Sequence, residues 1–168
     1  DGTQIWLTET DIDCIENYVL ARGIRGRKRW SEPWTFVLSK NSGEETSDQL
    51  QRQMQHLNQM REGIAAVFSP LFDAFHGKEH TVADQTYALY QFIRTLYVEE
   101  QLKARELRFA ETNPAKSKEY AQIYKIVMDL LDKVISLLGD EQISIREYGD
   151  ILDAGFAAAK VGIIPPGN

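Results

Sequence analysis

The sequence is short of the residues that disulfides, metal centres and membrane spans require. Its one cysteine, Cys14, can form no internal disulfide, and alone it can build neither a thiolate zinc site nor an iron–sulfur cluster. The spacing of Cys14 from Ile12 and Ile15 predicts a buried, inert thiol. No apolar run approaches the roughly 20 residues of a membrane helix, and no signal-peptide pattern opens the chain. We therefore expect no membrane association and a cytoplasmic location.

The common catalytic signatures are also missing. The sequence contains no G-x-x-x-x-G-K-[ST] phosphate-binding loop, no G-x-S-x-G nucleophile elbow and no Cys–His pair at a credible spacing. Residues 76–80 spell H-x-x-E-H, the inverted zinc-protease motif, which needs a helix to hold both imidazoles on one face. Because Gly77 interrupts the motif and Thr81 is suited to cap a following helix, we expect a turn there. The sequence predicts no catalytic residue, no cofactor site and no metal site.

Charge is unevenly distributed along a chain of otherwise ordinary composition. Its 168 residues are 43% hydrophobic and 26% charged, which is typical of one soluble globular domain. Residues 1–43 hold equal numbers of acidic and basic side chains, so the whole net charge of −6 lies in residues 44–168. That larger part repels a phosphate backbone on average. The basic cluster from Arg22 to Arg29 is the least unfavourable place for a contact with DNA.

Apolar side chains recur at helical spacing through most of the chain. Thr8 with Asp11 predicts the start of a first helix, and Gly23 predicts its end. Thr81 with Asp84 and Ser144 with Glu147 predict the starts of two later helices. In the long helix that is expected from residue 47, only Arg61 interrupts the apolar stripe. Residues 120–138 form an apolar face so broad that their helix should be central.

Six or seven such helices, joined by short turns, predict an all-α fold. We expect an irregular antiparallel bundle in a single domain over residues 1–168, with the main bundle at 47–160 and an extended arm at 161–168. Pro70 has no amide proton to donate, so the chain is expected either to kink there or to restart with Ser69 as the cap and Pro70 at the first helical position. We favour the restart.

Residues 23–46 are predicted to form one long basic loop, because glycine, proline and asparagine punctuate them. The loop contains the basic run RGRKRW and, further on, the strand-like run WTFVL. Its first four residues match the G-x-x-G loop of KH domains, but the chain offers too few strands for that fold. The candidate residues for contact with nucleic acid or a partner are Arg25, Arg27, Lys28, Arg29 and Trp30.

Two interpretations of this loop stay open. Cations beside an aromatic ring that can stack on a base are typical of proteins that bind single strands. Alternatively, Trp30 and Trp34 anchor the loop to the helices while the arginines are solvated or pair with acidic neighbours. In either case we expect the isolated chain to bind DNA weakly or not at all.

The two ends of the chain resemble one protein family. Residues 15–30 read IENYVLARGIRGRKRW and resemble the L-E-N-Y-V-L-A-x-G-I-x-G-x-x-W segment of the AddB subunit of bacterial AddAB-type helicase–nucleases. Residues 138–166 resemble a later stretch of that family, where a helix leads into a G-x-I-P-P arm. The two matches stand in the family's order, so the resemblance spans nearly the whole chain. The first residue is not methionine, and we expect an internal piece of a longer protein.

The resemblance implies more about the parent protein than about this segment. AddB-like subunits pair with an AddA-like ATP-driven helicase and resect double-strand DNA breaks for recombinational repair. The family uses ATP, Mg²⁺ and an iron–sulfur cluster, and the resemblance places all three outside this segment. The matched place in the family is a helical insertion in the second half of the helicase-like core, comparable to a 2B subdomain. On this basis the segment shapes the DNA path or a subunit interface.

Two functional hypotheses follow. The first is a non-catalytic helical subdomain of the B subunit of an ATP-dependent helicase/deoxyribonuclease in DNA repair and recombination. The second is a stand-alone helical module for protein–protein interaction without a role on DNA, which the net acidity and the absence of a catalytic motif favour. An enzymatic function comes third, and its only support is the motif at residues 76–80.

Overall fold

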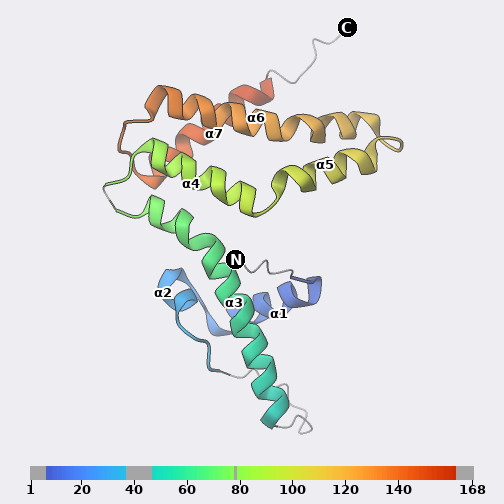
Figure 1. Cartoon of the computed structure of the whole chain (residues 1–168), viewed down its shortest axis with the longest axis vertical. Coiled ribbons are helices and arrows are strands. Elements are labelled where there is room, and N and C mark those ends of the chain that lie inside the picture. Colours follow the sequence, from blue (N-terminus) through green and yellow to red (C-terminus); the bar gives the residue numbers. More distant parts are fainter. Residues whose placement is uncertain (1–6, 37–46, 78, 162–168) are drawn as a thin grey trace. The chain divides into compact units, whose positions relative to one another are not determined.

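The computed structural model describes residues 7–36, 47–77 and 79–161. Within these ranges the secondary structure consists of helices without a strand, which confirms the all-α fold (Figure 1). The helices are α1 (Glu9–Arg22), α2 (Gly26–Ser31), α3 (Ser47–Phe75), α4 (Val82–Thr95), α5 (Val98–Phe109), α6 (Pro114–Leu138) and α7 (Ile145–Val161). The helix α7 includes Val161, and the rest of the predicted arm, residues 162–168, lies outside the described residues.

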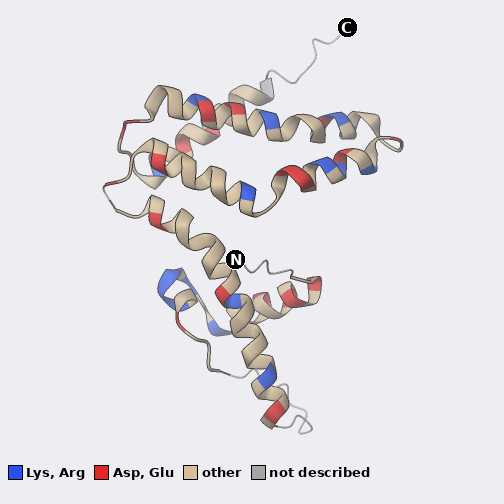
Figure 2. Cartoon of the chain, viewed as in Figure 1, with Lys and Arg blue, Asp and Glu red and all other residues tan. Residues whose placement is uncertain are grey.

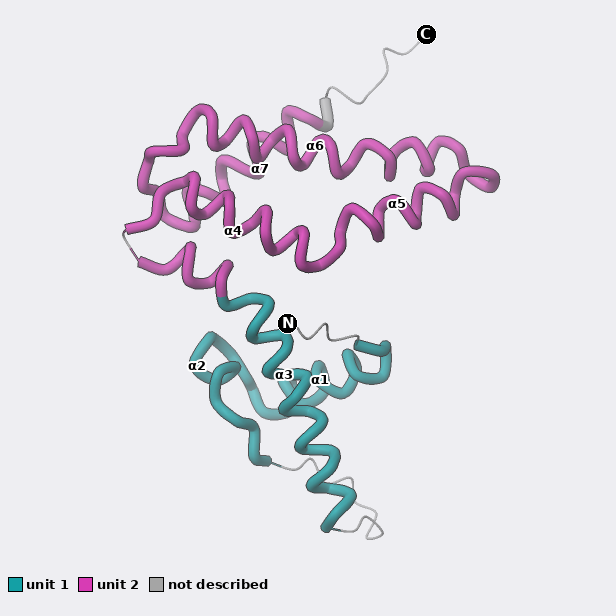
Figure 3. Tube along the Cα trace, in the orientation of Figure 1, with its two compact units in different colours: residues 1–69 teal, residues 70–168 magenta. Residues whose placement is uncertain are grey.

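The chain divides into two compact units, residues 1–69 and residues 70–168 (Figure 3). The boundary falls inside α3, between Ser69 and Pro70. The prediction of a single domain over residues 1–168, with its main bundle at 47–160, stays a prediction.

Pro70 does not end the helix, so the expected restart at Ser69 is wrong. The helix α3 continues through Pro70 to Phe75. Because proline lacks the amide proton, the carbonyl of Ala66 one turn earlier loses the hydrogen bond that an interior helical residue normally donates to it. On either side of Pro70 the helix is held by packing: Ile64 packs against the core of the first unit, and Phe75 packs against the core of the second.

Three helices begin with the same reciprocal cap, as the sequence predicts. A hydroxyl accepts the backbone N–H three residues ahead, and the carboxylate at that position accepts the N–H of the capping residue. These hydrogen bonds lower the pKa of each carboxyl group. The pairs are Thr8 with Asp11, Thr81 with Asp84, and Ser144 with Glu147.

Asp11 also joins α1 to α3. Its Oδ1 lies 2.9 Å from Nε2 of His56. The hydrogen bond with His56, followed by those with the backbone and hydroxyl of Thr8, lowers the pKa of Asp11 from 3.8 to about 2. One carboxylate therefore caps a helix and contacts a second helix of the same unit.

The acid sensitivity of this contact can be measured. Because the pKa of Asp11 is lower in the folded than in the unfolded chain, its stabilisation is complete above pH 3.8 and is lost as the pH falls towards 2. We expect Asp11→Asn to lower the melting temperature at pH 6 and to match the parent chain near pH 2. Asp13→Asn, on the same helix but outside the cap, is the control. A difference between parent and Asp11→Asn that stays constant from pH 6 to pH 2 would contradict the assignment.

The core of the first unit lies between α1, the segment after it, and α3. The buried residues of this cluster are Ile15, Tyr18, Ile24, Trp34, Leu57 and Met60. Ile15 and Tyr18 are three residues apart and so lie on the same face of α1. Cys14 points away from that face and is exposed, so the predicted burial of its thiol is wrong. The neighbouring Ile12 is also exposed, and the apolar spacing around Cys14 therefore misidentified the buried face.

In the second unit α6 contacts α4, α5 and α7, which agrees with its predicted central place. Figure 1 shows α5 and α6 side by side as an antiparallel hairpin. The buried cluster consists of Val82, Val134 and Tyr148, and the hydroxyls of Thr86 and Tyr148 share a buried hydrogen bond of 2.7 Å. The apolar face of α6 is nevertheless wider than its neighbours cover, because Leu137 is 69% exposed.

Two glycines of α7 provide a matched test of packing against α6. A Cβ at Gly155 would clash with Cδ1 of Leu130, whereas a Cβ at Gly149 would meet no atom within 4 Å. Alanine is the better helix former by about 1 kcal/mol, so Gly149→Ala should stabilise the chain. Gly155→Ala should be less stable than Gly149→Ala by about 1 to 3 kcal/mol, the usual cost of overpacking. Urea unfolding followed by circular dichroism measures both, and equal stabilities would show that α7 does not pack on Leu130.

Candidate nucleic-acid interface

The basic segment is partly helical, which corrects the prediction of an irregular loop over residues 23–46. Gly26–Ser31 form the short helix α2. Gly23 (φ +59°) and Gly26 (φ +73°) both take left-handed conformations, which glycine adopts at little cost, and so the chain turns between α1 and α2. Residues 34–36 of the predicted strand form none, and the rest of the loop, residues 37–46, lies outside the described residues.

Trp34 fixes the chain that follows α2. Its ring is 5% exposed and stacks on Tyr18 of α1, with ring centroids 4.8 Å apart. The Trp30 ring meets it edge-on at 5.2 Å. The indole N–H of Trp34 donates to the carbonyl of Arg29 at 2.9 Å. Both tryptophans therefore anchor the segment to the core of the first unit.

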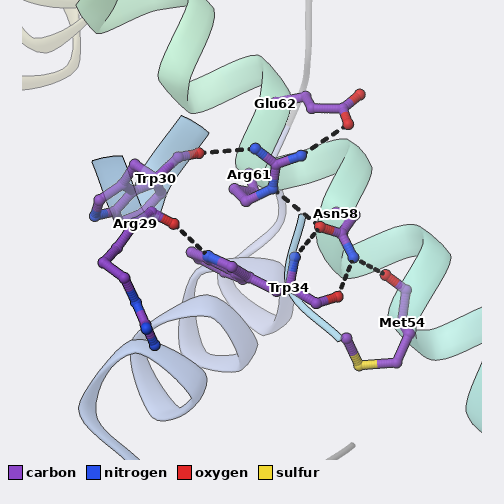
Figure 4. A network of polar contacts seen from close by, with 7 residues as sticks. All are labelled: Arg29, Trp30, Trp34, Met54, Asn58, Arg61 and Glu62. Atoms are coloured by element: carbon purple, nitrogen blue, oxygen red, sulfur yellow. Dashed lines mark hydrogen bonds and ion pairs between the residues drawn. The ribbon is translucent and has the colours of Figure 1, made fainter. Parts of the chain in front are cut away.

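Asn58 of α3 holds the backbone of Trp34 from the other side (Figure 4). Its Oδ1 accepts the Trp34 N–H at 2.8 Å, and its Nδ2 donates to the Trp34 carbonyl at 2.7 Å. The same amide donates to the carbonyl of Met54 at 3.1 Å and accepts from Nε of Arg61 at 3.0 Å. All four hydrogen-bonding positions of the Asn58 side chain are thus occupied.

Arg61 completes the network at the end of α2. Its side chain is nearly fully buried, and Nη1 donates to the carbonyl of Trp30 at 2.7 Å. The last carbonyls of a helix have no partner within the helix, so Arg61 supplies one for α2. Nη2 donates to Oε1 of Glu62 at 2.8 Å, and most of the Glu62 side chain is in solvent. The charge of Arg61 is therefore buried, and each of its three nitrogens donates a hydrogen bond.

The candidate residues separate into two groups around this network. Trp30 is half-buried, whereas the four cations are exposed. Figure 2 shows the basic residues as a blue stretch at α2. Nζ of Lys28 lies 4.0 Å from Oε1 of Glu32, and Nη2 of Arg27 donates to Ser69 at 3.4 Å. Of the two interpretations of the loop, the structure supports the anchoring role of the tryptophans. Contact of Arg25, Arg27, Lys28, Arg29 or Trp30 with DNA or a partner stays a prediction.

Asn58 and Arg61 were not predicted as part of this region. One signal was present, since Arg61 is the single charge in the apolar stripe of its helix. A charged residue at a position that faces the core requires a buried partner. Its partner here is a backbone carbonyl 31 residues away, and such a carbonyl leaves no trace in the sequence.

The described residues contain no group of three or more His, Cys, Asp or Glu side chains that could hold a metal ion. The H-x-x-E-H residues fall between the end of α3 at Phe75 and the start of α4 at Val82, so they lack the helix that the zinc motif needs. The ring of His76 instead stacks on Phe72, with centroids 3.6 Å apart. Across the described part of the chain, no helix is both long and apolar enough to span a membrane.

The contribution of Arg61 to stability can be tested by substitution. Arg61→Met keeps much of the side-chain volume but removes every donor, and it leaves the Trp30 carbonyl without its partner. Hydrogen bonds to a charged group contribute about 1.5 to 3 kcal/mol, so we expect a loss of that size. Arg52→Met, an exposed position on the same helix, should change the unfolding free energy little. Urea unfolding monitored by tryptophan fluorescence compares the two, and equal losses would contradict the role of Arg61.

Comparison with known proteins shows what the chain is similar to. No family model matches it. It is 34% identical over 163 residues to the B subunit of the ATP-dependent helicase/deoxyribonuclease of Lachnoclostridium phytofermentans, a match that covers 95% of this chain. The proteins of the same name from Moorella thermoacetica and Clostridium kluyveri are 35% and 33% identical over 159 and 162 residues, each covering 93% of it. In all three the match spans 14% of the relative's own length.

The fold and the anchored basic helix define an all-α module with a cationic surface segment. Along nearly its whole length this module is related to one segment of the B subunits of ATP-dependent helicase/deoxyribonucleases. The resemblance that residues 15–30 and 138–166 carry is thereby confirmed.

Proposed function

We propose that this chain is a non-catalytic helical subdomain, comparable to a 2B subdomain, of the B subunit of an ATP-dependent helicase/deoxyribonuclease. In this role it shapes the path of DNA or the interface with an AddA-like partner during repair of double-strand breaks. The observation that carries the proposal is the identity of about one third to B subunits over 93–95% of the chain. ATP hydrolysis and DNA cleavage are assigned to other parts of the enzyme, which acts in the cytoplasm.

The architecture is suited to a scaffold. Helix ends are capped by side chains in both units, and α2 is tied to α3 by a buried arginine. The exposed side chains of α2 include Arg27, Lys28 and Arg29, so its surface is suited to an anionic partner. The alternative of a stand-alone interaction module is less well supported, because each relative named above carries the matching segment within a much longer protein.

A segment exchange tests the proposal. The matching segment of the Lachnoclostridium phytofermentans protein is replaced by this chain, and the hybrid is assembled with its partner subunit. We expect the hybrid to unwind and degrade linear duplex DNA. A second hybrid, in which a Gly/Ser linker replaces the segment, should keep ATP hydrolysis but lose unwinding and degradation.

The two hybrids separate a scaffold from a dispensable or catalytic part. Full unwinding by the linker hybrid would show that the segment has no role in the path of DNA. Loss of ATP hydrolysis in the linker hybrid, with the complex still assembled, would contradict the non-catalytic assignment.

A further inference from the structure

Trp30 is not available in the way that base stacking requires. A stacking platform presents the face of an aromatic ring to the incoming base. The Trp30 ring is half-buried against the first unit's core and contacts Trp34 edge-on. Its carbonyl is held by the guanidinium of Arg61, so the backbone cannot swing the ring outward without breaking a buried, charge-assisted hydrogen bond.

The cations of α2 and of its N-cap residue, Arg25, are placed differently from Trp30. Arg25, Lys28 and Arg29 are exposed, and the Lys28 side chain is 87% accessible. No acidic side chain among the described residues pairs with Arg25 or Arg29. In Figure 4 the Arg29 side chain extends away from Asn58 and Arg61. These charges lie within five consecutive residues, where they can meet neighbouring phosphates.

A six-residue helix does not persist by itself in water, because fixing the first turn costs more conformational free energy than its few hydrogen bonds return. The helix α2 therefore depends on its contacts with α3. Arg61 holds its penultimate residue, and Asn58 holds the backbone three residues beyond its end. Neither side chain is placed to touch a ligand of α2, so both act as positioning residues for the cations.

We propose that the cationic face formed by Arg25, Lys28 and Arg29 binds the phosphate backbone of DNA. Trp30 makes no stacking contact with bases, and Arg61 and Asn58 position this face. The inference deepens the proposed function and rests on it. Contact with phosphates alone is independent of sequence and is at least as strong on a duplex, whose charge density is higher, as on a single strand. Stacking would instead favour the single strand.

The experiment measures the affinity of the 168-residue chain for a fluorescein-labelled duplex of about 20 base pairs and for the matching single strand at several salt concentrations. We expect weak binding that favours the duplex. Arg25→Ala with Arg29→Ala should reduce the slope of log K against log salt on the duplex by about two, since each lost phosphate contact removes about 0.9. Arg52→Ala with Arg146→Ala makes the same charge change at exposed positions of α3 and α7 and should leave the slope unchanged.

Two further variants test Trp30 and Arg61. Trp30→Leu keeps an apolar side chain but removes the aromatic ring, and it should leave both affinities and the slope unchanged. Arg61→Met should reduce the slope although every α2 cation is still present, and Arg61→Lys, which can still donate to the Trp30 carbonyl, should restore part of it. A merely structural Arg61 would change the unfolding midpoint without changing the slope. If Arg61→Met does not fold, the lysine variant still decides the question.

Three results would overturn the inference. Tighter binding to the single strand, lost in Trp30→Leu, would establish stacking. A slope unaffected by Arg25→Ala with Arg29→Ala would remove the cations from the contact. Absence of DNA binding at low salt, if the same double variant also captures the purified partner subunit more weakly, would make α2 a protein interface. In each case an active segment-exchange hybrid would leave the proposed function standing, so the two failures are distinguishable.

Discussion

The hydrogen bond from Arg61 to the carbonyl of Trp30 is the interaction on which the proposed working surface depends. It connects a long helix, α3, to a helix of six residues that cannot persist alone. Arg61 is itself oriented by Asn58, whose amide also holds the backbone of Trp34. A buried guanidinium is costly unless its donors are satisfied, and in this network the cost is offset by carbonyl, amide and carboxylate acceptors. The backbone that carries the exposed cations of α2 is thus held to α3 by hydrogen bonds.

Adjacent residues of the basic run have different structural roles: the tryptophan anchors the segment, and the cations remain exposed. In the run RGRKRW, the tryptophan faces the protein while the cations face solvent. Polar anchoring from α3 then fixes the backbone between them. A surface of this kind is suited to the proposed phosphate contact, because phosphates carry no direct information about base identity.

The sequence predicted those features that local chemistry determines. The caps at Thr8, Thr81 and Ser144 depend on a partner three residues ahead, and all three were correctly placed. Gly23, with its left-handed conformation, ends α1 as expected. The candidate cations were likewise found from their clustering, and all are exposed.

What the sequence did not reveal depends on contacts between distant residues. The helix α2 forms against α3, and its partners Asn58 and Arg61 stand more than twenty residues away from the segment they hold. The exposure of Cys14 follows from which face of α1 packs on α3, and the local apolar spacing around it misidentified that face. Continuation of α3 through Pro70 likewise runs against local propensity.

Pro70 removes one backbone hydrogen bond from the interior of α3. Since one interior hydrogen bond is missing there, α3 is held together less firmly at Pro70, the residue where the second compact unit begins, than an uninterrupted helix would be.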